Sequence, residues 1–209
     1  MRRFILTGAP GSGKTTLLRY LEGMGHAVVE EAATDVIAEE QRKGTAEPWR
    51  EDSFVERILT LQEHRQVLAA PPRPEIQIFD RSPLDTLALC RYSRLPVSSA
   101  LYARIRDAQA AGKYESDVFF IENLGFCEPS AARRISYQDA LRFEAIHEET
   151  YGEWGYQCVK IPPNPVRERA GQILRHIERS KTGISSLNVE QVVPAGHGGP
   201  AKRVTTNVP

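Results

Sequence analysis

The sequence lacks any apolar run that approaches the roughly 18 residues needed to cross a membrane. It also lacks an export signal, because only a short apolar stretch separates Met1-Arg2-Arg3 from Gly8, and we interpret that stretch as a first strand. Both absences lead us to expect a cytoplasmic protein that does not enter a membrane.

An excess of charge of either sign is also missing. The chain of 209 residues has 27 Lys and Arg and 27 Asp and Glu residues, so its formal net charge is zero. A protein with general affinity for nucleic acid or anionic lipid carries a basic surplus, so we expect neither partner. Hydrophobic content of 41% and charged content of 26% are ordinary for one globular domain with its own core.

Cysteine and suitably spaced histidine are scarce. The three cysteines lie far apart and form no C-x-x-C pair, which argues against a disulfide framework or a zinc site. The histidines also lack the spacing of metal ligands, and we assign no catalytic role to His26, His64, His147, His176 or His197. Other residue types are therefore expected to carry the chemistry.

One glycine-rich stretch near the N-terminus matches a motif completely. Residues 8–15 read GAPGSGKT and fit the pattern G-x-x-x-x-G-K-[ST] of a phosphate-binding P-loop. A strand-like run precedes it and a helical pattern follows it, so that backbone N–H groups and a helix N-terminus face the phosphates. We expect Lys14 to reach the β- and γ-phosphates and Thr15 to ligate Mg²⁺. The predicted nucleotide-binding residues are Gly8, Ala9, Pro10, Gly11, Ser12, Gly13, Lys14, Thr15 and Thr16.

Strand-like and helix-like segments alternate along the rest of the chain. Five short apolar runs, at residues 3–7, 26–29, 76–79, 118–121 and 156–161, are separated by segments with helical periodicity. This alternation predicts an α/β fold in three layers, with a five-stranded parallel sheet between helices on both faces. We assign residues 1–179 to this domain. Residues 180–209 are predicted to form a flexible tail, or a segment that folds over the site when nucleotide binds.

Polar residues follow the predicted strands, at the edge of the sheet where ligands bind in such folds. Asp80 ends the third strand and could hold Mg²⁺ with Thr15, or could instead cap the helix that begins at Ser82. Arg81 could clamp a phosphoryl group or a substrate oxygen, or could form a structural ion pair. Glu31, after the second strand, is the predicted base that accepts the proton of an attacking hydroxyl.

Two neighbours of Glu31 are weaker candidates for the same role. Glu30 points the opposite way on a strand end and is expected to be a surface charge. Asp35 lies one helical turn later and is the second choice of base. The predicted acceptor-binding residues are therefore Glu31, Asp35 and Arg81.

The segment after the fourth strand, at about residues 123–136, shows little periodicity. Its Arg133 and Arg134 could close over the nucleotide and neutralise charge on the transferred phosphoryl group, or could be an ordinary solvated pair. Arg142 is a weaker third candidate. Trp49 could stack on a planar substrate or belong to the core.

Together these motifs resemble a known family. GAPGSGKTT, VVEEAATDVI and IQIFDRSPLDTLAL, followed by an arginine-bearing segment before a helix, resemble the small P-loop kinase-like ATPases that include the ribosylnicotinamide kinase domain. The DRS element is also similar to that of deoxyribonucleoside kinases. The resemblance covers residues 1–179 and implies a strand order of 2-3-1-4-5 and a lid after the fourth strand. It also implies that Glu31 faces the phosphate acceptor and that Asp80 serves the metal.

These features favour ATP-dependent, Mg²⁺-assisted phosphoryl transfer to a hydroxyl of a small, nucleoside-like molecule. A mechanical ATPase usually has Glu after the acid of the third strand, whereas Arg81 follows Asp80 here, and the N-K-x-D motif of GTPases is missing. The alternative function is a nucleotide-dependent switch or regulatory binding protein with slow hydrolysis. GTP as well as ATP stays open as the nucleotide, and the sequence does not identify the acceptor.

Overall fold

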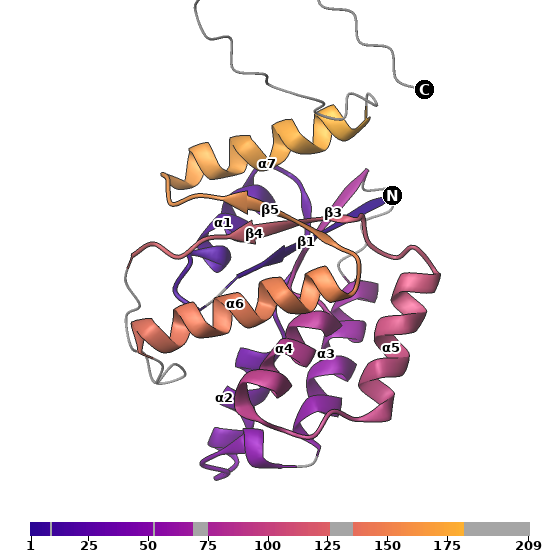
Figure 1. Ribbon diagram of the computed structural model, residues 1–209, viewed down its shortest axis with the longest axis vertical. Coiled ribbons are helices and arrows are strands. Elements are labelled where there is room, and N and C mark those ends of the chain that lie inside the picture. The colour runs from indigo at the N-terminus through magenta and orange to yellow at the C-terminus, as the bar shows by residue number, and fades with distance from the viewer. Residues whose placement is uncertain (9, 52, 69–74, 126–135, 182–209) are drawn as a thin grey trace, which may run out of the picture.

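The computed structural model describes residues 1–8, 10–51, 53–68, 75–125 and 136–181, and Figure 1 shows their arrangement. The strands are β1 (Arg2–Thr7), β2 (Ala27–Val29), β3 (Ile76–Asp80), β4 (Asp117–Ile121) and β5 (Gln157–Ile161). The helices are α1 (Lys14–Gly23), α2 (Ala33–Arg42), α3 (Phe54–Leu68), α4 (Pro83–Ser93), α5 (Ser99–Ala110), α6 (Tyr137–Glu153) and α7 (Val166–Lys181), with a short 3-10 helix η1 (Pro48–Arg50). None of the described helices is both long and apolar enough to cross a membrane.

The five strands form one parallel sheet in the order β2-β3-β1-β4-β5, which confirms the predicted topology. β1 lies at the centre between β3 and β4, with Leu6 opposite both Asp80 and Phe119. This register brings the C-terminal ends of the three central strands to one edge. The P-loop after β1 and the polar residues after β3 are therefore neighbours in space.

Helices cover both faces of the sheet, as the three-layer prediction requires (Figure 1). Successive residues of β1 point to opposite faces. Phe4 and Leu6 pack with residues of α1 and α7, whereas Ile5 packs with residues of α3, α4, α5 and α6. Residues 118–121 of β4 are fully buried, which explains why this strand is a continuous apolar run.

A smaller apolar cluster lies between α2, η1 and α3. Ala32, Val36, Phe54 and Ile58 are buried there, and Trp49 packs against them. Trp49 lines a hollow between η1, the start of α3 and the segment before α5, and does not line the cavity beside the P-loop. The structure therefore supports the core alternative for this tryptophan rather than stacking on a substrate.

Candidate active site

The P-loop joins the C-terminal end of β1 to the start of α1. Gly8, Gly11 and Gly13 have φ angles of 129°, 84° and 79°, a region that residues with a Cβ atom rarely adopt. At Gly8 the requirement is also steric, because a Cβ atom would lie 2.3 Å from the carbonyl oxygen of Ile121 at the end of β4. These glycines therefore allow the loop to turn tightly against the central strands.

Lys14 is the first residue of α1, and only 6% of its surface is exposed. Its ammonium group donates hydrogen bonds to the Gly8 carbonyl at 2.6 Å and to Ser12 Oγ at 3.2 Å. Burial and, after it, the charge of Arg81 lower the pKa of Lys14 to about 7. A phosphate bound in the loop would bring the negative charge that favours the protonated ammonium.

Asp80 is the last residue of β3, and 3% of its surface is exposed. Its Oδ1 atom is buried and has no hydrogen-bond partner among the described residues. Burial and the nearby negative charge of Glu31 raise the pKa of Asp80 to about 6. A buried carboxylate oxygen without a donor is a group that a metal ion could satisfy. The other role considered for Asp80, the helix cap, belongs instead to Ser82.

Arg81 has a φ of 73°, which is uncommon for a residue other than glycine, and its N–H donates to the Leu6 carbonyl at 3.0 Å. The Arg81 Nε atom lies 3.0 Å from Glu31 Oε1, and Nη1 lies 3.3 Å from Asp85 Oδ1. Burial disfavours the charge, but these two carboxylates and Asp80 raise the pKa of Arg81 above its ordinary value. The structural ion pair considered from the sequence is therefore present, and the phosphoryl clamp stays a prediction.

Asp85, a buried residue in the first turn of α4, was not predicted from the sequence. It accepts hydrogen bonds from Thr7 Oγ1 at 2.6 Å, from the Ser82 N–H at 2.8 Å and from the Tyr151 hydroxyl at 2.5 Å. Burial opposes its ionisation, but the positive charge of Arg81 and these hydrogen bonds hold the pKa of Asp85 below its ordinary value. A signal was available in the sequence, because Ser82 and Asp85 have the spacing of a capping box at the start of a helix.

A cavity of about 400 Å³ lies beside the P-loop, between that loop and residues of α2, α3, α4 and α6. Lys14 and Thr15 of the P-loop line it, and so do Glu31 and Arg81. Its apolar walls are formed by Ile37, Ile58, Leu59, Leu89 and Phe143. Gln62 of α3 adds a buried amide whose Nε2 atom has no hydrogen-bond partner among the described residues. Apolar walls with a few polar groups are typical of a small-molecule site.

The three acidic residues near the end of β2 have different surroundings. Glu31 lines the cavity and accepts a hydrogen bond from Thr34 Oγ1 at 3.2 Å. Arg65 of α3 donates to the Glu31 carbonyl and to the Asp35 carboxylate. Asp35 does not line the cavity, and Glu30 is exposed. The structure therefore brings Glu31 to the cavity, while Asp35 contacts Arg65 outside it.

Arg169, a residue of α7 that was not predicted from the sequence, lies under the P-loop. Its Nη2 donates to the Ser12 carbonyl at 2.8 Å, and Nη1 would lie 3.1 Å from a Cβ atom built on Gly13. Burial lowers the pKa of this guanidinium. The sequence signal was a charge within the apolar stripe of α7, since Ile173 and Ile177 follow it at four-residue steps.

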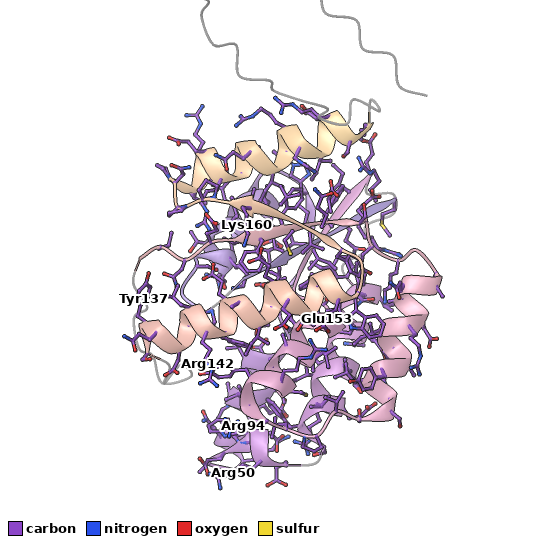
Figure 2. All side chains as sticks on the ribbon, viewed as in Figure 1. Arg50, Arg94, Tyr137, Arg142, Glu153 and Lys160 are labelled. Carbon is purple, nitrogen blue, oxygen red and sulfur yellow. The ribbon has the colours of Figure 1, made fainter. Side chains whose placement is uncertain are left out.

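Several predicted site residues fall outside the described part of the chain. These are Ala9, Arg133 and Arg134, together with most of the predicted lid and residues 182–209 of the predicted tail. Arg142 is described, is exposed on the N-terminal half of α6 (Figure 2) and does not line the cavity. The domain boundary at residue 179 also stays a prediction, and α7 continues to Lys181.

The strand order, the P-loop between β1 and α1 and the buried acid at the end of β3 define a P-loop kinase-like NTPase. A family model described as an AAA domain matches residues 3–169. The chain therefore belongs to this AAA-domain family. No curated protein sequence matches the chain.

Solved structures show the same fold at low sequence identity. NadR in complex with NAD and AMP-PNP is 14% identical with a TM-score of 0.59, and the match covers 90% of this chain and 51% of that one. Deoxyadenosine kinase from M. mycoides, with dCMP and dCDP, is 15% identical with a TM-score of 0.53, covering 84% and 98% of the two chains. Thymidylate kinase from Candida albicans is 10% identical with a TM-score of 0.52, covering 86% and 92%.

Proposed function

We propose that the protein is a small-molecule kinase, which transfers the γ-phosphoryl group of ATP to a hydroxyl of a nucleoside-like acceptor. The observation that carries this proposal is the cavity, because Lys14 and Thr15 of the P-loop and Glu31 all line it. A donor phosphate and an acceptor hydroxyl could meet within it. Nucleoside and nucleotide kinases among the structures with this fold support the choice.

In this reaction the acceptor oxygen forms a bond to the γ-phosphorus, and the bond from that phosphorus to the oxygen bridging it to ADP breaks. Glu31 accepts the hydroxyl proton, and its ion pair with Arg81 orients the carboxylate at the cavity wall. Lys14 binds the β- and γ-phosphates. Arg133 and Arg134 stay predicted lid cations, which would neutralise charge on the transferred group.

Asp80 and Thr15 are the residues that would hold Mg²⁺. The buried Asp80 oxygen without a donor fits this role. No group of three or more His, Cys, Asp or Glu side chains among the described residues could hold a metal. Mg²⁺ usually takes only one or two carboxylates together with substrate phosphates, so a dedicated cluster is not required. When bound, the ion would neutralise charge on the phosphates of ATP or GTP.

The cavity walls favour an acceptor with a flat ring. Apolar side chains from α2, α3, α4 and α6 offer surfaces on which a planar group could pack, and Phe143 is the aromatic one. The Gln62 Nε2 amide group, which has no partner in the part of the chain that the structure describes, could donate a hydrogen bond to a ring nitrogen or carbonyl. Nucleosides and related heterocycles with a free hydroxyl combine these features.

A panel of nucleosides, nucleotides and related metabolites tests the proposal through acceptor-stimulated release of ADP or GDP. Lys14→Ala should abolish the stimulated rate and weaken nucleotide binding. Glu31→Gln should lower kcat about 100-fold or more while leaving the affinity for ATP nearly intact, because it removes the proton acceptor and the ion pair with Arg81 but does not change the P-loop. Glu30→Gln makes the same change at the exposed neighbour and should behave as wild type.

Different results would point to other functions. Nucleotide binding with slow hydrolysis that no acceptor stimulates would favour the switch or regulatory protein. Equal loss of ATP affinity and turnover in Glu31→Gln would assign that residue a structural role. Unchanged turnover in Lys14→Ala would contradict the P-loop assignment itself.

A further inference from the structure

His147 is a fully buried histidine in α6. The buried face of α6 runs through Ala140, Phe143 and His147 at steps of three and four residues. Phe143 lines the cavity, and its ring centroid lies 4.2 Å from that of His147. His147 is therefore a buried polar group directly behind the cavity wall.

The two ring nitrogens of His147 have partners of opposite kind. Nδ1 lies 2.8 Å from the carbonyl oxygen of Phe143, which can only accept, so Nδ1 carries the proton. Nε2 lies 3.1 Å from Nη1 of Arg81, which can only donate, so Nε2 offers its lone pair. One neutral tautomer satisfies both contacts, and a protonated ring would lose the contact with Arg81.

The surroundings of the ring favour its neutral form. Burial lowers the pKa of His147 to about 4, and the charges of Arg81 and Lys14 act in the same direction. Asp85 opposes this effect, and its Oδ1 atom lies 3.4 Å from Nε2. The carbonyl of Phe143 also opposes it. The ring is therefore neutral at pH 7, as the hydrogen bonds require.

We propose that His147 is a positioning residue that, together with Asp85, holds Nη1 of Arg81 so that the Nε edge of the guanidinium faces Glu31. The proposal rests on the proposed role of Glu31 as the base. Nη1 has two hydrogens and meets two acceptors, Asp85 Oδ1 from α4 and His147 Nε2 from α6. Both bonds hold the guanidinium in place, and its Nε atom stays 3.0 Å from Glu31 Oε1, an ion-pair contact that lacks hydrogen-bond geometry.

The first test needs no enzymatic activity. ¹⁵N NMR of the full chain at pH 7 should show a neutral His147 ring with its proton on Nδ1. The Arg81 Nε–H should exchange slowly with solvent, because it is buried against Glu31. A His147 proton on Nε2, or a doubly protonated ring, would overturn the proposal, since neither form accepts a hydrogen bond from Arg81.

Two substitutions of His147 test its hydrogen bond to Arg81 separately from its hydrogen bond to the Phe143 carbonyl. The amide oxygen of His147→Gln reaches the position of Nε2, whereas His147→Asn reaches only the Phe143 carbonyl. We expect the acceptor-dependent kcat to fall about tenfold or more in His147→Asn and to stay within about threefold of wild type in His147→Gln. The KM for ATP should change by less than about twofold in both. His176→Gln in α7, where the ring pairs with Asp117, is the matched control and should leave kcat unchanged.

Equal losses of kcat in the Gln and Asn variants would overturn the proposal, because packing alone would then explain them. A wild-type kcat in His147→Asn would overturn it as well. If the wild-type chain transfers phosphate to no acceptor, the proposed function fails and Arg81 Nε–H exchange decides the positioning role. Faster exchange in the Asn variant but not in the Gln variant supports the role, and equal exchange in the two overturns it.

Discussion

Replacement of Asp80 with Asn should stabilise the nucleotide-free protein, and the gain should grow with pH. The pKa of Asp80 is raised from 3.8 to about 6 by burial and by Glu31, so this carboxyl ionises less readily in the folded chain than in the unfolded chain. Below pH 3.8 the carboxyl is protonated in both the folded and the unfolded chain, and Asp80 then costs no stability. As the pH rises from 3.8 through about 6, the unfolded chain ionises first, and the free energy of unfolding falls. At 1.36 kcal/mol per pKa unit, the raised pKa of Asp80 costs on the order of 3 kcal/mol of stability at pH 8 and roughly half of that at pH 5.

Urea unfolding of the wild type and of Asp80→Asn at pH 8 and pH 5 measures this cost. The decisive quantity is the gain at pH 8 minus the gain at pH 5, which should be positive and roughly 1–2 kcal/mol, because the fit of the Asn amide contributes equally at both values. Asp107→Asn makes the same change at an exposed position and should show a much smaller difference. Saturating Mg²⁺ and nucleotide should stabilise the wild type more than Asp80→Asn. An equal gain at both pH values, or a larger gain at pH 5, would refute the reasoning.

Substitutions at three other buried positions should have separable effects. Gly8→Ala should lower the free energy of unfolding in urea by about 3 kcal/mol or more, because its Cβ would meet the Ile121 carbonyl at 2.3 Å with a positive φ. Arg169→Met should weaken ATP binding about tenfold, as measured by calorimetry. Its free energy of unfolding should change by less than about 1 kcal/mol, because the loss of the hydrogen bond to the P-loop is offset when a charge no longer has to be buried. Tyr151→Phe should lower the free energy of unfolding by about 1.5–3 kcal/mol, because Asp85 loses a buried donor.

Each of these substitutions has a matched control elsewhere in the chain. Gly44→Ala keeps a positive φ of 100° but meets no atom within 4 Å, so a loss as large as that of Gly8→Ala would contradict the steric argument. Arg175→Met removes an exposed arginine of the same helix as Arg169, and equal effects on ATP binding would point to general electrostatics. Tyr102→Phe removes a tyrosine hydroxyl away from the site. An equal loss of unfolding free energy in this variant would show that the hydrogen bond from Tyr151 to Asp85 has no specific effect on stability.

Local sequence patterns were sufficient to locate the elements of the fold. An apolar run marks each strand, and the residues that follow Phe79 and Val29 lie near the C-terminal edge of the sheet because parallel strands share that direction. The P-loop was identified without tertiary information, since its glycines and Lys14 are consecutive or nearly consecutive residues of a single loop. The strand order came from the resemblance of the motifs to a known family and was confirmed by the structure.

Periodicity was less reliable where a polar residue occupies the buried face of a helix. In α6 the buried stripe continues from Phe143 to His147, a histidine to which no catalytic role was assigned from the sequence. Arg169 was missed in α7 for the same reason, because a charge within an apolar stripe reads as a surface position. Such residues are buried only where another part of the chain provides partners, here Arg81 for His147 and the Ser12 carbonyl for Arg169.

The sequence by itself determined that this chain holds a phosphate in a loop between a strand and a helix, and that an acid and an arginine follow the third strand. Only the tertiary structure decided what those residues contact. Arg81 pairs with Glu31, which follows β2, and with Asp85 of α4, and His147 of α6 reaches it although the two residues are 66 positions apart in the chain. These contacts depend on how helices pack across one face of the sheet, and side-chain spacing within a single segment carries no information about that packing.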